Sequence, residues 1–220
     1  MKDLLIYVAD ADALAFMSAI LSKWRALEIR SITFDIERHP QRDPGMVQSG
    51  AELVRMKKGH YSKALLMWDH HGSGREHRNT PEQVRGDIQN KLDAFTWKDN
   101  STVTVLVPEL EQWLWHCENA LATHCGVTVN QLMQWVNEHA GKLNKTYEAL
   151  KAEEPKELFE HVMCKRLKRT ISPRDFEKIG QRASIENLME CESFQSIADI
   201  LREWFPATKM PSGEWDNKLF

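Results

Sequence analysis

One stretch of this sequence decides its fold, and it reads Ala64-Leu65-Leu66-Met67-Trp68-Asp69-His70-His71-Gly72-Ser73-Gly74-Arg75-Glu76. Its first five residues are apolar without a break, which is typical of a strand that helices cover on both faces of a parallel sheet. Polar residues and glycines follow at once, so we expect the strand to end near Asp69 and to turn into a loop. Because ligands bind beyond the carboxyl ends of parallel strands, the polar chemistry of the protein is predicted at this junction.

Further strands and helices alternate on either side of this stretch. Apolar runs predict strands at 4–9, 29–36 and 102–107. Helical spacing of apolar residues predicts helices over 13–27, 47–57, 81–92 and from 109 onward, with a polar loop over 37–45. Pro81 is expected to begin the third of these helices, with Thr80 as its cap. This order predicts an α/β fold, a mostly parallel sheet flanked by helices.

The character of the chain changes after about residue 118, where strand-like runs give way to helical spacing. Helices are predicted around 128–139, 156–169, 173–180 and 193–205. We therefore expect an α/β core over 1–118, a helical region over 119–205 that packs on this core, and a loose tail over 206–220.

Composition narrows the class of protein. A hydrophobic content of 42% and a charged content of 28% are typical of a globular protein, and the net charge of -3 gives no overall attraction to nucleic acid. No apolar run approaches the roughly 18 to 20 residues of a membrane span. The four cysteines form no Cys-x-x-Cys pair. We expect packed, reduced thiols, a cytoplasmic location and no membrane partner.

Acidic residues follow three of the predicted strands. Asp10 and Asp12 follow the first, Asp69 ends the third, and Glu109 and Glu111 follow the last. Carboxylates gathered at one edge of a sheet repel one another unless a cation lies between them, and hard divalent ions prefer oxygen ligands. The pattern predicts a Mg²⁺ or Mn²⁺ site. The alternative is that Asp10, Asp12 and Glu109 are helix caps, because each precedes or opens a predicted helix.

The turn after Asp69 has two interpretations of its own. Asp69 and His71 are at alternate positions, so both side chains are predicted to point the same way and to share a metal ion. Alternatively the turn is solvated, and Gly72 and Gly74 only provide its tight backbone geometry.

A basic cluster occurs later, at Lys165, Arg166, Lys168 and Arg169. Such a cluster is a candidate contact for nucleic-acid phosphates. A charged run on a helix is also typical of a solvated face, and the sequence leaves both interpretations open.

Asp10-Ala11-Asp12-Ala13 and Asp69-His70-His71 resemble the DHH phosphoesterases, in which several Asp and His residues hold two Mn²⁺ ions. That family has a further strand-end Asp shortly before its DHH motif. The segment 59–63 of this chain contains none.

A second resemblance spans most of the chain. It rests on Arg42-Asp43-Pro44-Gly45, on the stretch from Trp68 to Glu76, on 81–92, on Val107-Pro108-Glu109-Leu110-Glu111-Gln112-Trp113-Leu114-Trp115, on 154–157 and on 193–205. These segments resemble a bacterial family of uncharacterised Toprim-like proteins, in which Gly72, Gly74, Arg75 and Glu76 match a signature turn. Some members are encoded in anti-phage loci, notably the methylation-associated defence system. The resemblance implies a Toprim-like fold and partners encoded in a defence operon.

Toprim domains hold Mg²⁺ with a Glu after the first strand and an Asp-x-Asp after a later one. Here Asp10 stands in the first place and His71 in that of the second acid. A DHH-like phosphoesterase that acts on small nucleotides is the weaker alternative, and two further functions stay open. One is a metal-dependent nuclease or phosphodiesterase, with metal ligands Asp10, Asp12, Asp69 and His71 and catalytic residues Asp69, Glu109 and Glu111. The other is a non-catalytic sensor or assembly subunit of a defence complex.

Overall fold

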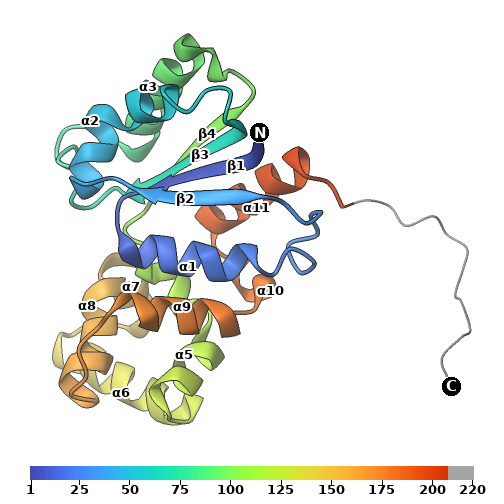
Figure 1. The fold of residues 1–220 in the computed structure, drawn as a ribbon. Helices are drawn as coiled ribbons and strands as arrows, with labels where there is room; N and C mark the ends of the chain where they lie inside the picture. The colour runs from blue at the N-terminus through green and yellow to red at the C-terminus, as the bar shows by residue number, and fades with distance from the viewer. Residues whose placement is uncertain (208–220) are drawn as a thin grey trace, which may run out of the picture.

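The computed structural model describes residues 1–207 of the 220-residue chain, and its centre is a parallel sheet. The strands are β1 (Lys2–Val8), β2 (Phe34–Arg38), β3 (Tyr61–Asp69) and β4 (Ser101–Leu106). They pair in the order β2-β1-β3-β4, and every pair is parallel (Figure 1). The predicted α/β fold is confirmed. Strand β2 lies on one side of β1 and β3 lies on the other, so the order in which strands are added to the sheet reverses between β1 and β3. Ligands of α/β proteins bind at such a switch point.

Helices cover both faces of this sheet (Figure 1). On one face lie α2 (Arg42–Arg55) and α3 (Pro81–Leu92), which pack on Leu5, Leu66 and Trp68. Thr80 and Pro81 begin α3 as predicted, with a capping box that Gln83 completes. On the other face lie α1 (Ala11–Leu21) and α11 (Glu192–Trp204), which pack on the alternate residues of the same strands. The two alternating sets explain why the central strands read as unbroken apolar runs.

The helical region lies beyond α1, on the side away from the sheet (Figure 1). Helix α4 (Glu111–Trp115) leads from the sheet into this region, which then contains α5 (Glu118–Cys125), α6 (Val129–Lys142), α7 (Tyr147–Glu153), α8 (Pro155–Glu160), the π-helical turn η2 (His161–Arg166), α9 (Pro173–Arg182) and α10 (Ile185–Leu188). Helix α9 lies so close to α1 that a Cβ atom at Gly180 would come within 3.0 Å of the Ala19 Cβ. One apolar cluster therefore continues from β1 through α1 into the helical region. Trp113 and Trp115 are fully buried in it.

Several predicted boundaries were wrong. Helix α1 ends at Leu21 rather than at 27, and turns follow it. Strand β2 covers 34–38 rather than 29–36. It is an edge strand in which Phe34 and Ile36 alternate with charged residues, so it lacks the unbroken apolar run that marks a central strand. Residue 29 instead forms an isolated antiparallel bridge with Pro206. The helix expected over 156–169 ends at Arg166, and α5, α7 and α10 were not predicted.

The start of α2 is the correction that matters most for the site. The sequence predicts a loop over 37–45, but α2 begins at Arg42. Pro44 lies in its first turn, where a missing backbone N–H breaks no helical hydrogen bond. Asp43 is therefore helical and lies beside the carboxyl end of β3, where its carboxylate accepts a hydrogen bond from the Asp69 backbone N–H at 3.0 Å.

Residues 208–220 of the predicted tail lie outside the described part of the chain, whereas Pro206 is paired as noted. Within residues 1–207, no helix combines the length and the apolar character needed to cross a bilayer. All four cysteines are unbridged thiols, and Cys117, Cys125 and Cys191 are buried.

Candidate metal centre

The candidate centre lies where β3 and β4 end side by side. Strand β3 ends at Asp69, and β4 leads through Pro108 to Glu109 and the short helix α4. The Leu110 backbone N–H donates a hydrogen bond to Asp69 Oδ1 at 3.0 Å. The Asp69 carboxylate thus joins the end of one strand to the segment that follows its neighbour, and this brings the acids of both strands together.

Three carboxylates form the core of the centre, and we call Asp69, Glu109 and Glu111 the acidic trio. Each offers one oxygen atom, and these three atoms lie within 4.8 Å of one another. Glu109 and Glu111 are 5% and 8% exposed. Among residues 1–207, no other residue donates a hydrogen bond to the Glu111 carboxylate. Its own backbone N–H is the one donor to it. A buried carboxylate with so few donors, beside two others, is an arrangement that a hard divalent cation satisfies.

The electrostatics of the trio reflect this crowding. Asp69 keeps part of its residue surface accessible, but its carboxyl group is enclosed by protein atoms. Burial, followed by the charges of Glu111, Asp43, Asp10 and Glu109, raises the pKa of Asp69 well above its usual value. Burial is also the main cause that raises the pKa of Glu111 to about 7. Each ionised form is therefore costly in the protein alone, and a bound cation would relieve that cost.

The structure places the other predicted acids around the trio rather than in it. Asp10 is the N-cap of α1, because its Oδ1 accepts hydrogen bonds from the backbone N–H groups of Asp12 and Ala13 at 3.1 and 2.9 Å. Burial, and then the charge of Asp10, raises the pKa of Asp12 to about 6. The capping alternative is thus confirmed for Asp10, and both acids act on the trio through their charge.

Two side chains approach Glu109, one at each carboxylate oxygen. His71 Nδ1 lies 3.0 Å from Glu109 Oε1, and the His71 side chain is 62% exposed. Lys156 Nζ lies 3.9 Å from Glu109 Oε2. His70 lies elsewhere, with its Nε2 at 3.2 Å from the Asn79 carbonyl oxygen. Of the two histidines on which the resemblance to DHH phosphoesterases rests, only His71 contacts the trio.

The glycines of the predicted signature turn have a clear backbone role. Gly72 and Gly74 have φ angles of 84° and 76°, the left-handed region that other residues rarely adopt. The Arg75 backbone N–H donates to the Ser73 hydroxyl, and the Arg75 side chain is exposed. Backbone N–H groups of the turn, first that of Glu76 itself, lower the pKa of Glu76. The turn therefore positions the His71 side chain within hydrogen-bond distance of Glu109.

Sequence reasoning missed two residues of this centre. Asp43 was hidden because Pro44 suggested a loop, although Asp43 belongs to one of the segments that carry the resemblance. Lys156 belongs to the helical region, about 45 residues away from Glu111 along the chain, and no local pattern connects the two. Only the packing of α8 on α4 brings Lys156 to the trio.

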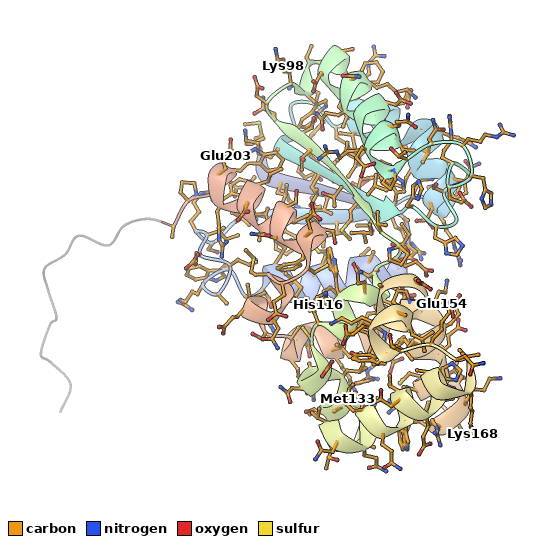
Figure 2. The ribbon with its side chains drawn as sticks, turned by 180° about the vertical axis from the view of Figure 1, so that it is seen from behind. Lys98, His116, Met133, Glu154, Lys168 and Glu203 are labelled. Atoms are coloured by element: carbon orange, nitrogen blue, oxygen red, sulfur yellow. The ribbon has the colours of Figure 1, made fainter. Side chains whose placement is uncertain are left out.

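The basic cluster lies apart from the trio. Arg166 forms an ion pair with Glu138, and Arg169 Nη2 lies 3.5 Å from Asp175 Oδ1. Figure 2 shows Lys168 at the far end of the helical region, beyond Glu154 as seen from the sheet. Lys165 and Lys168 have no ion pair with a described residue. The four cations therefore belong to a separate surface.

Comparisons of this chain with protein-family models, with curated proteins and with solved structures found no match. The geometry of the trio and its neighbours, together with the resemblance described above, is therefore the basis for a function.

Proposed function

We propose that this chain is a divalent-metal-dependent phosphodiesterase that acts on nucleic acid. The observation that carries the proposal is the acidic trio, in which a buried Glu111, bound only by its own backbone N–H, adjoins Asp69 and Glu109. The donors are all oxygens, which suits Mg²⁺ or Mn²⁺ better than softer ions. The position at the carboxyl end of a parallel sheet supports the same proposal.

Each residue has a role in this proposal. Asp69, Glu109 and Glu111, whose oxygens lie within 4.8 Å of one another, would hold Mg²⁺ or Mn²⁺. The metal would supply a water of lowered pKa and would stabilise negative charge on the phosphate. His71 orients Glu109 through Nδ1. The Leu110 N–H fixes the Asp69 carboxylate, and the Asp43 carboxylate fixes the Asp69 backbone N–H.

The cellular setting is part of the proposal and follows from the Toprim-like resemblance alone. We place the chain in the cytoplasm of a bacterium, as one component of an anti-phage system whose partners are encoded beside it. On this view its substrate is phage or host nucleic acid, and its activity depends on those partners.

The test is cleavage of labelled single- and double-stranded DNA and RNA with Mg²⁺, with Mn²⁺ and with EDTA. We expect metal-dependent cleavage that Glu111→Gln lowers by at least about 100-fold, because the substitution removes a charged ligand without changing shape. Glu52→Gln is the matched control, since Glu52 is exposed on α2, outside the trio. Cleavage in EDTA, or full activity of Glu111→Gln, would overturn the proposal.

A second candidate is the non-catalytic assembly subunit, and one observation favours it. The carboxylates of Asp69 and Asp43 both accept backbone hydrogen bonds, which is a structural use of acids. Asp69→Asn retains an oxygen acceptor for the Leu110 N–H but lacks the charge. An assembly subunit carrying this substitution would still protect bacteria against phage, whereas a metal-dependent enzyme would not.

A further inference from the structure

Lys156 is held at the trio by a buried contact from the helical region. It is the second residue of α8, directly after Pro155, which is buried. The indole N–H of Trp115 donates a hydrogen bond to the Pro155 carbonyl oxygen at 2.8 Å. Trp115 lies on α4, one turn after Glu111. The helix that carries Glu111 therefore also fixes the start of the helix that carries Lys156.

The ammonium group of Lys156 is close to the trio but bound to none of it. Its Nζ lies 3.9 Å from Glu109 Oε2, beyond hydrogen-bond length, and the side chain is 51% exposed. Burial opposes its charge, yet the carboxylates of Glu111, Glu109 and Asp69 outweigh this and raise the pKa of Lys156. Within residues 1–207, its N–H donors have no hydrogen-bond acceptor. A charged group with unused donors at the edge of a metal centre is positioned for an anionic ligand.

We propose that Lys156 binds the phosphate group of the substrate beside the metal, and that without substrate it competes with the metal for the charge of the trio. The inference rests on the phosphodiesterase function proposed above. A lysine ammonium and a divalent cation next to the same carboxylates repel each other. A phosphate that contacts both cations removes this repulsion, because its oxygens accept hydrogen bonds from lysine and also ligate the metal.

The proposal predicts effects of opposite sign from one substitution. Lys156→Met keeps the length and the apolar stem of the side chain but removes the charge. Without phosphate, the variant is expected to bind Mn²⁺ roughly three- to tenfold more tightly than the unmodified protein at moderate ionic strength. With phosphate, it loses the cooperativity between metal and anion. A lysine that only stabilises the fold would lower both affinities or neither.

The experiment measures Mn²⁺ affinity from the electron paramagnetic resonance signal of free Mn²⁺, with and without thymidine monophosphate as the phosphate probe. In the unmodified protein, the nucleotide should tighten Mn²⁺ binding several-fold, and in Lys156→Met it should have no effect. Lys142→Met is the matched control, because Lys142 is an exposed lysine at the end of α6. Circular dichroism confirms that each variant is folded.

The outcomes separate this inference from the function on which it rests. Unchanged or weaker Mn²⁺ binding by Lys156→Met, or intact cooperativity with the nucleotide, overturns the role of Lys156 while the metal centre stands. If the unmodified protein binds no Mn²⁺, the proposed function fails. In that case, calorimetric titration with thymidine monophosphate alone tests Lys156. Equal affinity of the unmodified protein and of Lys156→Met for the nucleotide overturns the role of Lys156 as well.

Discussion

Glu111 offers the sharpest test of the electrostatics of the trio, through Glu111→Gln in the metal-free protein. Burial raises the pKa of this carboxyl from 4.5 to about 7. Between these two values the folded state holds a proton that the unfolded state has released, so the free energy of unfolding falls as the pH rises. The deficit is complete above pH ~7. At about 1.4 kcal/mol per pH unit, the interval from 4.5 to about 7 sets an upper bound of about 3.5 kcal/mol.

Glutamine has nearly the shape of glutamate and carries no charge, so Glu111→Gln should remove this deficit. We expect the variant to be about 1–3 kcal/mol more stable than the unmodified protein at pH 8 in EDTA, with a difference that shrinks towards pH 5. Chemical denaturation at pH 5, 6, 7 and 8 measures it. The exposed Glu52→Gln should give a small difference at every pH.

Two results would refute this reasoning. One is a Glu111→Gln variant that is less stable than the unmodified protein at pH 8, which would mean that the Glu111 carboxylate has a favourable partner. The other is a stability difference that does not change with pH. Saturating Mn²⁺ offers a further check, because at 100 times Kd a ligand adds about 2.7 kcal/mol to a protein that binds it. Only the unmodified protein should gain this amount in full.

Two further predictions concern the helical region. Gly180→Ala should lower the free energy of unfolding by about 1 kcal/mol, because its Cβ would crowd α1 at 3.0 Å, whereas Gly141→Ala, in open space on α6, should raise it by about 0.5–1 kcal/mol. Denaturant midpoints of the two variants measure both effects, and a shift of the same sign would contradict the packing argument. The second prediction concerns Asp175. Burial raises the pKa of this carboxyl, but hydrogen bonds from Ser172 and His124 outweigh burial and lower the pKa. Asp175 therefore stabilises the protein above pH ~3.8 and less as the pH falls further, so Asp175→Asn should cost about 1–2 kcal/mol at pH 7 and less near pH 3 in urea titrations.

The strands were predictable from sequence because burial on both faces leaves a strong signal. The run from Ala64 to Trp68 is apolar at every position, and it forms the centre of β3. That acids after β3 and β4 would converge also followed from parallel topology. Edge strand β2 has a weaker pattern, since Phe34 and Ile36 alternate with charged residues, and its position was missed.

The composition of the centre was only partly predictable, and the reason is geometric. A sequence pattern indicates that Asp10, Asp69 and Glu109 share one edge of a sheet, but not which of them come within coordination distance. Asp10 turns back to cap α1, whereas Glu111, one residue beyond the N-cap of α4, points into the trio. Lys156 reaches the centre through a tertiary contact of Trp115, which no periodicity along the chain encodes.

The difference between satisfied and unsatisfied carboxylates is the strongest argument about function. Asp10 and Asp69 accept backbone hydrogen bonds, so a purely structural role accounts for both. Glu111 accepts a backbone hydrogen bond only from its own N–H, and burial outweighs this bond and raises the pKa of the carboxyl, which makes its charged form costly without a cation. A glutamine or an apolar residue would fit there at lower cost. Proteins keep such a residue where activity requires it, because stability and function then oppose each other. A cation bound at Glu111 would therefore favour the enzyme, and the Asp69→Asn test of phage protection separates the enzyme from the assembly subunit.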